Sequence, residues 1–206
     1  ASNFDFVLDA MTLTEGDINQ DGWRDFLITN TPQDTDILLT YNPETAQFED
    51  ITNAHFGSLL AESWTWGARF IDFDNDTDLD AFVAEHYPAQ PYQLNHFFEN
   101  GGSENDHFFF IPSTDIFPED FTNAHSVASA DWNRDGRIDF AVHNLGNHKI
   151  RMWENVTVNT NHWVEIELRG TLSNSQAVGS WVEVHCDHPA SPFRSYTALG
   201  ADYLSQ

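Results

Sequence analysis

Three nonapeptides of the sequence carry oxygen-bearing side chains at alternate positions. They read DINQDGWRD at 17–25, DFDNDTDLD at 72–80 and DWNRDGRID at 131–139, and they share the pattern D-x-[DN]-x-D-[GT]-x-x-D. Positions 1, 3, 5 and 9 offer side-chain oxygen, and position 7 can add a backbone carbonyl. An all-oxygen set suits calcium better than zinc or copper, which favour nitrogen and sulfur. The spacing therefore predicts about three calcium ions, one per loop.

The candidate ligands are assigned by their position in each loop. Positions 1, 3, 5 and 9 are expected to bind through the side chain, and position 7 through its backbone carbonyl (Trp23, Asp78 and Arg137). The full candidate set is Asp17, Asn19, Asp21, Trp23, Asp25, Asp72, Asp74, Asp76, Asp78, Asp80, Asp131, Asn133, Asp135, Arg137 and Asp139.

Two other interpretations compete with calcium binding. An isolated acidic run is usually a solvated turn, but these loops begin 55 and 59 residues apart, a period that indicates repeated supersecondary units. An EF-hand requires glutamate at position 12 and a helix on each side. Position 12 is instead apolar (Ile28, Val83 and Val142), inside an expected strand. Recurrence and spacing therefore favour calcium loops of another kind.

The second loop departs from the pattern at its turn. Position 6 is Thr77, where the other loops have Gly22 and Gly136. Glycine permits the positive φ of a sharp turn, whereas a β-branched residue resists it. We expect this turn to be strained or differently shaped, and the additional carboxylate of Asp78 to compensate electrostatically.

Short strands must position these loops. Apolar runs follow each loop at 26–29, 81–84 and 140–143, and the run at 66–71 precedes the second loop. Further strand-like runs lie at 37–42, 92–100 and 149–155, with later ones at 48–52 and 107–112. No helical periodicity is sustained. Four short antiparallel strands per unit predict an all-β fold of β-propeller blades, three of which are visible.

Composition limits the possible partners. The chain has 33 acidic and 8 basic side chains, giving a net charge of −25, which excludes a general nucleic-acid surface and disfavours anionic lipid. Hydrophobic residues make up 40 %, enough for a globular core. No apolar run approaches the length of a membrane span. One cysteine, Cys186, excludes an internal disulfide. Cations are the expected partners.

The loops and their flanks resemble a known repeat. WGARFIDFDNDTDLDAFVAEH and ILLTYNPETAQFEDIT are similar to the FG-GAP (VCBS-type) repeats of integrin-like β-propellers. The stretch NHWVEIELRGTLSNSQAVGSWVEV (161–184), followed by YLSQ, resembles the opening of the ASPIC/UnbV domain. That domain follows such repeats in bacterial secreted proteins and in cartilage acidic protein.

The resemblance implies a division of the chain and a location. Residues 1–157 would form three FG-GAP-like blades, and 158–206 part of a small β-rich ASPIC/UnbV-like domain. The matched loop aspartates would be calcium ligands, as their chemistry also suggests. Because complete propellers of this type have about seven blades, we expect an excerpt of a longer protein. The family also implies an extracellular or cell-surface location.

A second set of polar residues follows the strand that leaves each loop. These are Asn30, Glu85, His86 and Asn144. A strand of about four residues spans ~13 Å, so we expect them on the face opposite the loops, as a ligand face or as ordinary turn residues. The tetrapeptide TNAH recurs at 52–55 and 122–125, so His55 and His125 are expected to mark equivalent turns between blades.

Three functional classes remain open. The first is a non-catalytic calcium-binding module for adhesion, scaffolding or binding of an extracellular protein or glycan. The second is a propeller enzyme acting on polysaccharide, which needs an acid/base pair such as Glu85 with His86. The third is a structural subunit of a surface layer or filament that self-associates through open blades. The sequence favours the first, because it carries no catalytic motif.

Overall fold

The computed structural model of the chain describes residues 9–56, 64–86, 95–104, 107–112, 123–146, 149–172, 174–185 and 193–196. Nearly every regular element in these ranges is a β-strand, and the helix α1 (Thr52–His55) spans four residues. The predicted all-β class is therefore confirmed. No helix within the described ranges is long and apolar enough to cross a membrane.

Three antiparallel sheets correspond to the three sequence units. The first has the order β1 (Thr12–Gly16), β2 (Asp25–Thr29), β3 (Ile37–Asn42), β4 (Gln47–Asp50). The second has the order β5 (Thr65–Ile71), β6 (Asp80–Glu85), β7 (His96–Glu104), β8 (His107–Pro112). The third places β10 (Asp139–Asn144) between β9 (Ala124–Ala130) and β11 (Arg151–Trp153). The predicted four-strand plan thus holds for the first two units, and the described part of the third has three strands.

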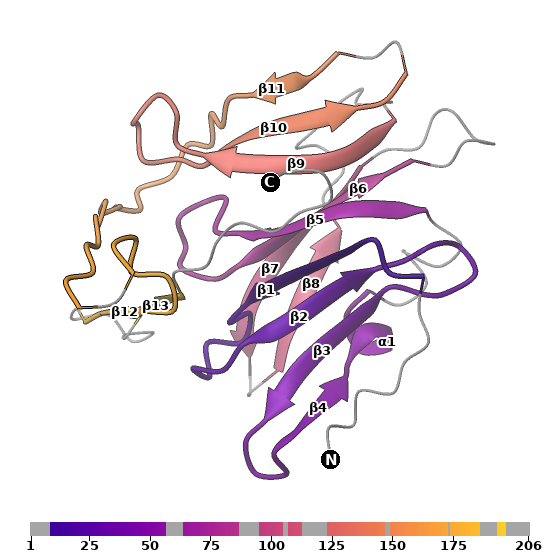
Figure 1. Cartoon of the computed structure of the whole chain (residues 1–206), viewed down its shortest axis with the longest axis horizontal. Helices are drawn as coiled ribbons and strands as arrows, with labels where there is room; N and C mark the ends of the chain where they lie inside the picture. Colours follow the sequence, from indigo (N-terminus) through magenta and orange to yellow (C-terminus); the bar gives the residue numbers. More distant parts are fainter. Residues whose placement is uncertain are drawn as a thin grey trace.

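Each acidic loop joins the first and second strands of its sheet. The first strands lie next to one another, since β1 contacts β5 and β5 contacts β9. Figure 1 shows the consequence: the β1–β2, β5–β6 and β9–β10 loops all project on the left of the view, and β2, β6 and β10 run away from them. The three loops therefore share one side of the molecule.

Apolar side chains fill the two spaces between the sheets. The first space is filled mainly from the first two sheets, by Ile18, Leu27, Leu38, Phe56, Ala68, Ala81, Val83 and Phe98. The second is filled from the second and third sheets, by Ile71, Phe82, Ala84, Phe97, Ala124, Val127, Phe140 and Val142. Alternation along a strand sends neighbouring side chains of β6 to opposite faces, so the central sheet contributes to both clusters. Burying each large side chain contributes roughly 1.5–3 kcal/mol.

The chain after the third sheet has little regular structure. Residues 154–172 and 174–180 contain no strand, and β12 (Trp181–Val184) pairs with β13 (Phe193–Tyr196) in a two-stranded hairpin. Apolar side chains here stay exposed, with Val158 at 96 % and Leu172 at 101 %. The expected β-rich region is therefore reduced to this hairpin among the described residues, because these side chains have no opposing sheet. The boundary at 157/158 remains a prediction.

The two copies of TNAH differ in structure, contrary to expectation. Residues 52–55 form α1, whereas Ala124 and His125 begin strand β9. The buried ring of His125 lies 4.0 Å from that of Trp66 and 5.0 Å from that of His86. Identical local sequence is overridden here by the packing of the second and third sheets.

An asparagine in the third strand or just after it fastens the second and the third sheet to the preceding loop. Asn100 donates from Nδ2 to the carbonyls of Ile18 (3.1 Å) and Leu79 (3.2 Å). Asn155 donates in the same way to Phe73 (2.7 Å) and Ile138 (3.2 Å). In both copies the first acceptor is position 2 of the preceding loop, and the second is position 8 of the residue's own loop.

The side chain at position 4 fastens each loop to the next one. Gln20 donates from Nε2 to the carbonyl of Thr77 (2.9 Å), and Asn75 donates from Nδ2 to the carbonyl of Gly136 (3.0 Å). Both acceptors occupy position 6 of the following loop. Two recurring side-chain bonds therefore set the spacing of neighbouring loops in addition to the apolar core.

We expect Asn155→Ala to destabilise the protein by about 2 kcal/mol, because it removes two hydrogen bonds to the partly buried carbonyls of Phe73 and Ile138. Asn155 is itself buried and also accepts the backbone N–H of Thr157. The exposed Asn53 in α1 provides the control, and Asn53→Ala should change stability by less than about 0.5 kcal/mol. Denaturant unfolding measures both, and equal small effects would contradict the fastening role.

Candidate metal-binding loops

The three loops have the same backbone conformation. Position 4 is left-handed in each, with φ of 58° at Gln20, 58° at Asn75 and 61° at Arg134. Position 6 is also left-handed, with φ of 89° at Gly22, 84° at Thr77 and 87° at Gly136. Thr77 therefore adopts the glycine conformation, and the second loop is strained rather than differently shaped.

Backbone N–H groups turn inward and bind the acidic side chains in a repeated scheme. The position 1 carboxylate accepts the position 6 N–H at 2.9, 3.1 and 2.8 Å in the three loops. The position 3 oxygen accepts the position 5 N–H at 3.2, 3.2 and 3.0 Å. The position 5 carboxylate accepts the position 7 N–H at 2.8, 3.1 and 3.0 Å. The alternation seen in the sequence thus places positions 1, 3 and 5 around one turn.

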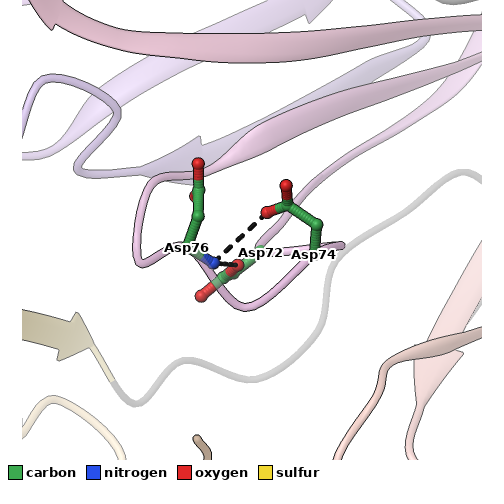
Figure 2. Close-up of side chains that lie close together, drawn as sticks. All are labelled: Asp72, Asp74 and Asp76. Atoms are coloured by element: carbon green, nitrogen blue, oxygen red, sulfur yellow. Dashed lines mark hydrogen bonds between the residues drawn. The ribbon is translucent and has the colours of Figure 1, made fainter. Parts of the chain in front are cut away.

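The second loop brings three carboxylates to one point. Ligand oxygens of Asp72, Asp74 and Asp76 all lie within 4.8 Å of one another. Figure 2 shows these side chains around the turn, with the Asp76 N–H bound by Asp72 (3.1 Å) and Asp74 (3.2 Å). Two oxygens on one calcium ion can be separated by at most about twice the 2.3–2.6 Å bond length. The observed spacing fits a common calcium ion.

In the first and third loops, an asparagine at position 3 reduces the repulsion between the carboxylates. Asn19 donates from Nδ2 to Asp21 at 3.0 Å, and Asn133 donates to Asp135 at 3.0 Å. Asp135 also forms an ion pair with Arg137. The second loop has Asp74 at position 3, so it lacks this amide bond and carries five carboxylates.

The aspartate at position 9 braces the loop against the third strand. Asp25, Asp80 and Asp139 are buried, and one oxygen of each accepts the position 2 N–H at 3.0, 2.9 and 3.3 Å. The other oxygen accepts the N–H of Tyr41 (3.2 Å), Asn100 (2.8 Å) and Asn155 (2.8 Å), respectively. Sequence reasoning assigned position 9 to the metal alone. A carboxylate oxygen has a second lone pair, so the ligand role stays a prediction alongside the brace.

Burial and mutual repulsion disfavour the ionised carboxylates. Desolvation, opposed by backbone hydrogen bonds, raises the pKa of Asp25 and of Asp80 to about 8. Desolvation and the neighbouring Asp76 raise the pKa of Asp72 to about 7 and also raise that of Asp74. A cation that neutralised this repulsion would favour the ionised forms.

Asp78 does not supply the expected electrostatic compensation. Its side chain is only 7 % exposed. Desolvation, followed by repulsion from Asp76, raises its pKa to about 9. The additional carboxylate is therefore a cost of the second loop, and its backbone carbonyl remains the predicted ligand.

The expected ligand face is largely buried. Asn30 follows β2, and Glu85 and Asn144 are the last residues of β6 and β10, so all three lie at the strand ends away from the loops, and all three are buried. Asn30 donates from Nδ2 to the carbonyl of Thr35 (2.9 Å), and Asn144 donates to that of Lys149 (3.0 Å). The expectation that these residues form an exposed ligand face is therefore corrected. The three buried residues lie inside the protein, and His86 alone of the four is partly exposed.

Glu85 is paired differently from the expected acid/base arrangement. It is 2 % exposed, and its carboxylate contacts Nε2 of His96. Nearby Asp36 accepts hydrogen bonds from the Asn30 N–H (2.8 Å) and the Thr65 hydroxyl (2.6 Å). Desolvation raises the pKa of Asp36 to about 7. Sequence reasoning missed Asp36 and His96 because neither belongs to the repeated motif.

We expect Thr77→Gly to stabilise the protein by about 1 kcal/mol, because it relieves a β-branched residue at positive φ. Glycine loses more conformational entropy on folding than threonine does, and this loss offsets part of the relieved strain. The expected gain is the difference between the two free energies. Gly22→Ala tests the same position in the first loop and should destabilise by about 1 kcal/mol. Denaturant unfolding in one buffer compares the two, and a destabilising Thr77→Gly would show that the turn is unstrained.

We expect the metal-free protein to lose stability as pH rises from 6.5 to 8, by about 1.4 kcal/mol per pH unit for each proton that the folded state retains. The folded state keeps protons on Asp25, Asp72 and Asp80 that the unfolded chain has already released, so raising the pH favours unfolding. His125 acts in the opposite sense only at lower pH, because burial lowers its pKa to about 4. Urea unfolding in a chelator across this range tests the slope, and a rising stability would refute it.

The comparison with known families concerns the first two loops. Residues 17–83 match the family model described as FG-GAP-like repeat, from the start of the first loop to strand β6. No curated protein sequence matches the chain significantly. The resemblance of 161–184 to the ASPIC/UnbV domain therefore stays a prediction. The segment that holds the loops at 17–25 and 72–80 is therefore similar to an FG-GAP-like repeat.

Proposed function

We propose that this chain is a calcium-rigidified, non-catalytic module that presents a binding surface outside the cell. The observation that carries the proposal is the left-handed backbone shared at positions 4 and 6 by three acidic loops, in one of which three carboxylates have ligand oxygens within 4.8 Å of one another. Side chains that repel one another need a counter-charge, and a divalent cation supplies two charges at one point. Three such ions would reduce the net charge from −25 to −19, since −25 + 6 = −19.

The side chains at positions 1, 3, 5 and 9 and the backbone carbonyl at position 7 would hold the ion, and the aspartate at position 9 would also hold the loop. The calcium ion, when bound, supplies positive charge that stabilises the ionised carboxylates. Each loop contacts its neighbour through the position 4 amide and the third-strand asparagine. A loop held by an ion would therefore also hold the adjacent sheet.

An extracellular location follows from the same chemistry. FG-GAP repeats are typically extracellular, and sites in extracellular modules have Kd values of roughly 10⁻⁴–10⁻³ M. Cytosolic free calcium would leave such sites unfilled. On sequence resemblance, we infer that residues 158–206 begin an ASPIC/UnbV-like domain of the same secreted protein.

The enzyme and structural-subunit hypotheses receive less support. The acid/base pair proposed from sequence, Glu85 with His86, is replaced by a buried contact between Glu85 and His96. A buried carboxylate bound by its own sheet is poorly placed to meet a polysaccharide. Self-association through open blades would appear as a concentration-dependent mass in solution.

We expect calcium to raise the melting temperature strongly and magnesium to restore little of the effect, because magnesium demands a tighter octahedral shell. At a few millimolar calcium each site would contribute about 1–2 kcal/mol and three sites roughly 3–6 kcal/mol together. Thermal melting in calcium, magnesium and chelator at matched ionic strength measures this. Identical curves in calcium and chelator would contradict the proposal.

Single-site variants separate the loops. Asp21→Ala removes a ligand from the first loop only, so the bound calcium should fall from three ions to two, with a loss of calcium-dependent stability. The exposed His185, which pairs with Glu183, provides the matched control. His185→Ala should leave the ion count and the calcium dependence unchanged. Metal analysis after dialysis against calcium buffer gives the count.

A further inference from the structure

A polar pocket lies beside the second and third loops, where the chain passes them after strand β11. Its volume is about 280 Å³. The lining includes Asn75 and Asp135 from the two loops, together with Arg137, Asn159, Asn161 and Trp163. Among these residues, only Asp135 is a predicted metal ligand through its side chain. The pocket is therefore distinct in its chemistry from the loop interiors.

Hydrogen bonds tie the wall of the pocket to both loops. Asn159 and Asn161 donate from Nδ2 to the carbonyl of Asp74, the latter at 3.2 Å. Asn161 also donates its backbone N–H to Asn159 Oδ1 at 3.1 Å. On the other side, Arg137 donates from Nε to the carbonyl of Asn155 at 2.7 Å. The segment 155–161 is thus held across the second loop and against the third.

Trp163 forms an aromatic wall over the third loop. Its indole lies directly on Gly136, since a Cβ built on that glycine would be 1.9 Å from Cδ1 and Nε1 of the ring. Only glycine leaves room for this contact, in addition to its positive φ. The side chain is nevertheless 50 % exposed. One part of the ring is seated on the loop while the rest remains available to a ligand.

We propose that this pocket binds a neutral saccharide unit, with Trp163 as the stacking surface. The carboxamides of Asn75, Asn159 and Asn161 each use one Nδ2 proton on a backbone carbonyl. Because an amide has a second N–H proton and a carbonyl oxygen with two lone pairs, each can still donate to and accept from a sugar hydroxyl. An indole ring offers an apolar face with a polar edge, suited to the C–H face of a sugar ring. The volume is at the lower end of ligand pockets and fits one small ring rather than an extended ligand.

Charge selects among saccharides. The chain carries −25, and the neighbouring loops place carboxylates close to the pocket. Arg137 is the one cationic side chain among the lining residues, and Asp135 pairs with it. A uronic-acid or sulfated sugar would meet repulsion there without an unpaired cation to offset it. The structure therefore favours neutral hexoses, including N-acetylated ones.

The proposal deepens the proposed function, because it names the ligand class of the binding module, and its test keeps the two apart. The full chain is titrated with neutral hexose oligomers (β-glucan and N-acetylglucosamine oligomers) and with oligogalacturonate, in calcium and in chelator. We expect saturable binding of a neutral oligomer, observed by calorimetry and by a change in tryptophan fluorescence, and at least tenfold weaker binding of oligogalacturonate.

Variants locate the site. Trp163→Ala should weaken binding at least tenfold, and Asn161→Ala severalfold, while both retain the calcium-dependent melting of the parent. Trp181 in β12 is also partly exposed but does not line the pocket, so Trp181→Ala is the matched control and should bind normally. Trp163→Phe, which keeps an aromatic face, should retain most of the affinity.

The outcomes are separable from those of the calcium test. Calcium-dependent melting without binding of any neutral oligomer would overturn the saccharide proposal and leave the metal proposal standing. Binding that survives Trp163→Ala unchanged would also overturn it. Saccharide binding that requires Trp163 but occurs without any effect of calcium on melting would support the pocket and refute the metal sites.

Discussion

The gathering of carboxylates at one turn of each sheet is the constraint around which the rest of the molecule is organised. Positions 1, 3 and 5 place oxygen on the inside of the loop, where the N–H groups of positions 5, 6 and 7 converge on them. Two left-handed residues, at positions 4 and 6, make this convergence possible. The N–H groups offset part of the repulsion, and burial increases what remains. The loops therefore need both a fixed backbone and a counter-charge.

The same loops act as joints between the sheets. In the second and third sheets, the buried aspartate at position 9 accepts the backbone N–H of an asparagine in the third strand (Asn100) or just after it (Asn155). The side chain of the same asparagine bonds the preceding loop. The first sheet departs from this scheme, because the equivalent residue is Tyr41. Its ring instead packs against Trp23 (4.7 Å) and Phe48 (5.1 Å). The amide fastening thus appears where a preceding loop of the described chain is present to receive it.

Sequence reasoning was strongest where the pattern is local and repeated. The nonapeptides and the alternating runs around them are short-range signals, so the strands and the shared loop geometry could be expected in advance. The asparagine of the third strand could not be expected in advance, since Asn155 bonds Phe73 across 82 residues. Asn155 lies outside the nonapeptide motif, and the motif leaves position 2, which Phe73 occupies, unspecified. The expected exposed ligand face was not found for a related reason. Whether a residue at the end of a strand is buried depends on the neighbouring strands, as Glu85 shows by being buried beside His96 of β7.

The C-terminal segment shows the opposite limit. The resemblance implied a β-rich region from residue 158 onward, yet Val164 and Ile166 remain exposed and residues 161–170 form no strand. Apolar residues of this kind form stable strands only when another sheet or strand buries them. The part of this segment that is fixed is held by polar contacts to the loops, through Asn155, Asn159 and Asn161.

The second loop has the largest number of carboxylates and bonds both of its neighbours. It has Asp74 where the other loops have an amide at position 3, and it is joined to the first loop through Gln20 and to the third through Asn75. Its backbone carbonyls accept hydrogen bonds from three parts of the chain. Thr77 accepts from Gln20 of the first loop, Phe73 from Asn155 after β11, and Asp74 from Asn161 further along. Any change in charge that relaxed or tightened this loop would be felt at both interfaces, because the bonds that position the neighbours end on its backbone. We infer that the central loop, rather than the outer two, governs how rigidly the three sheets are held together.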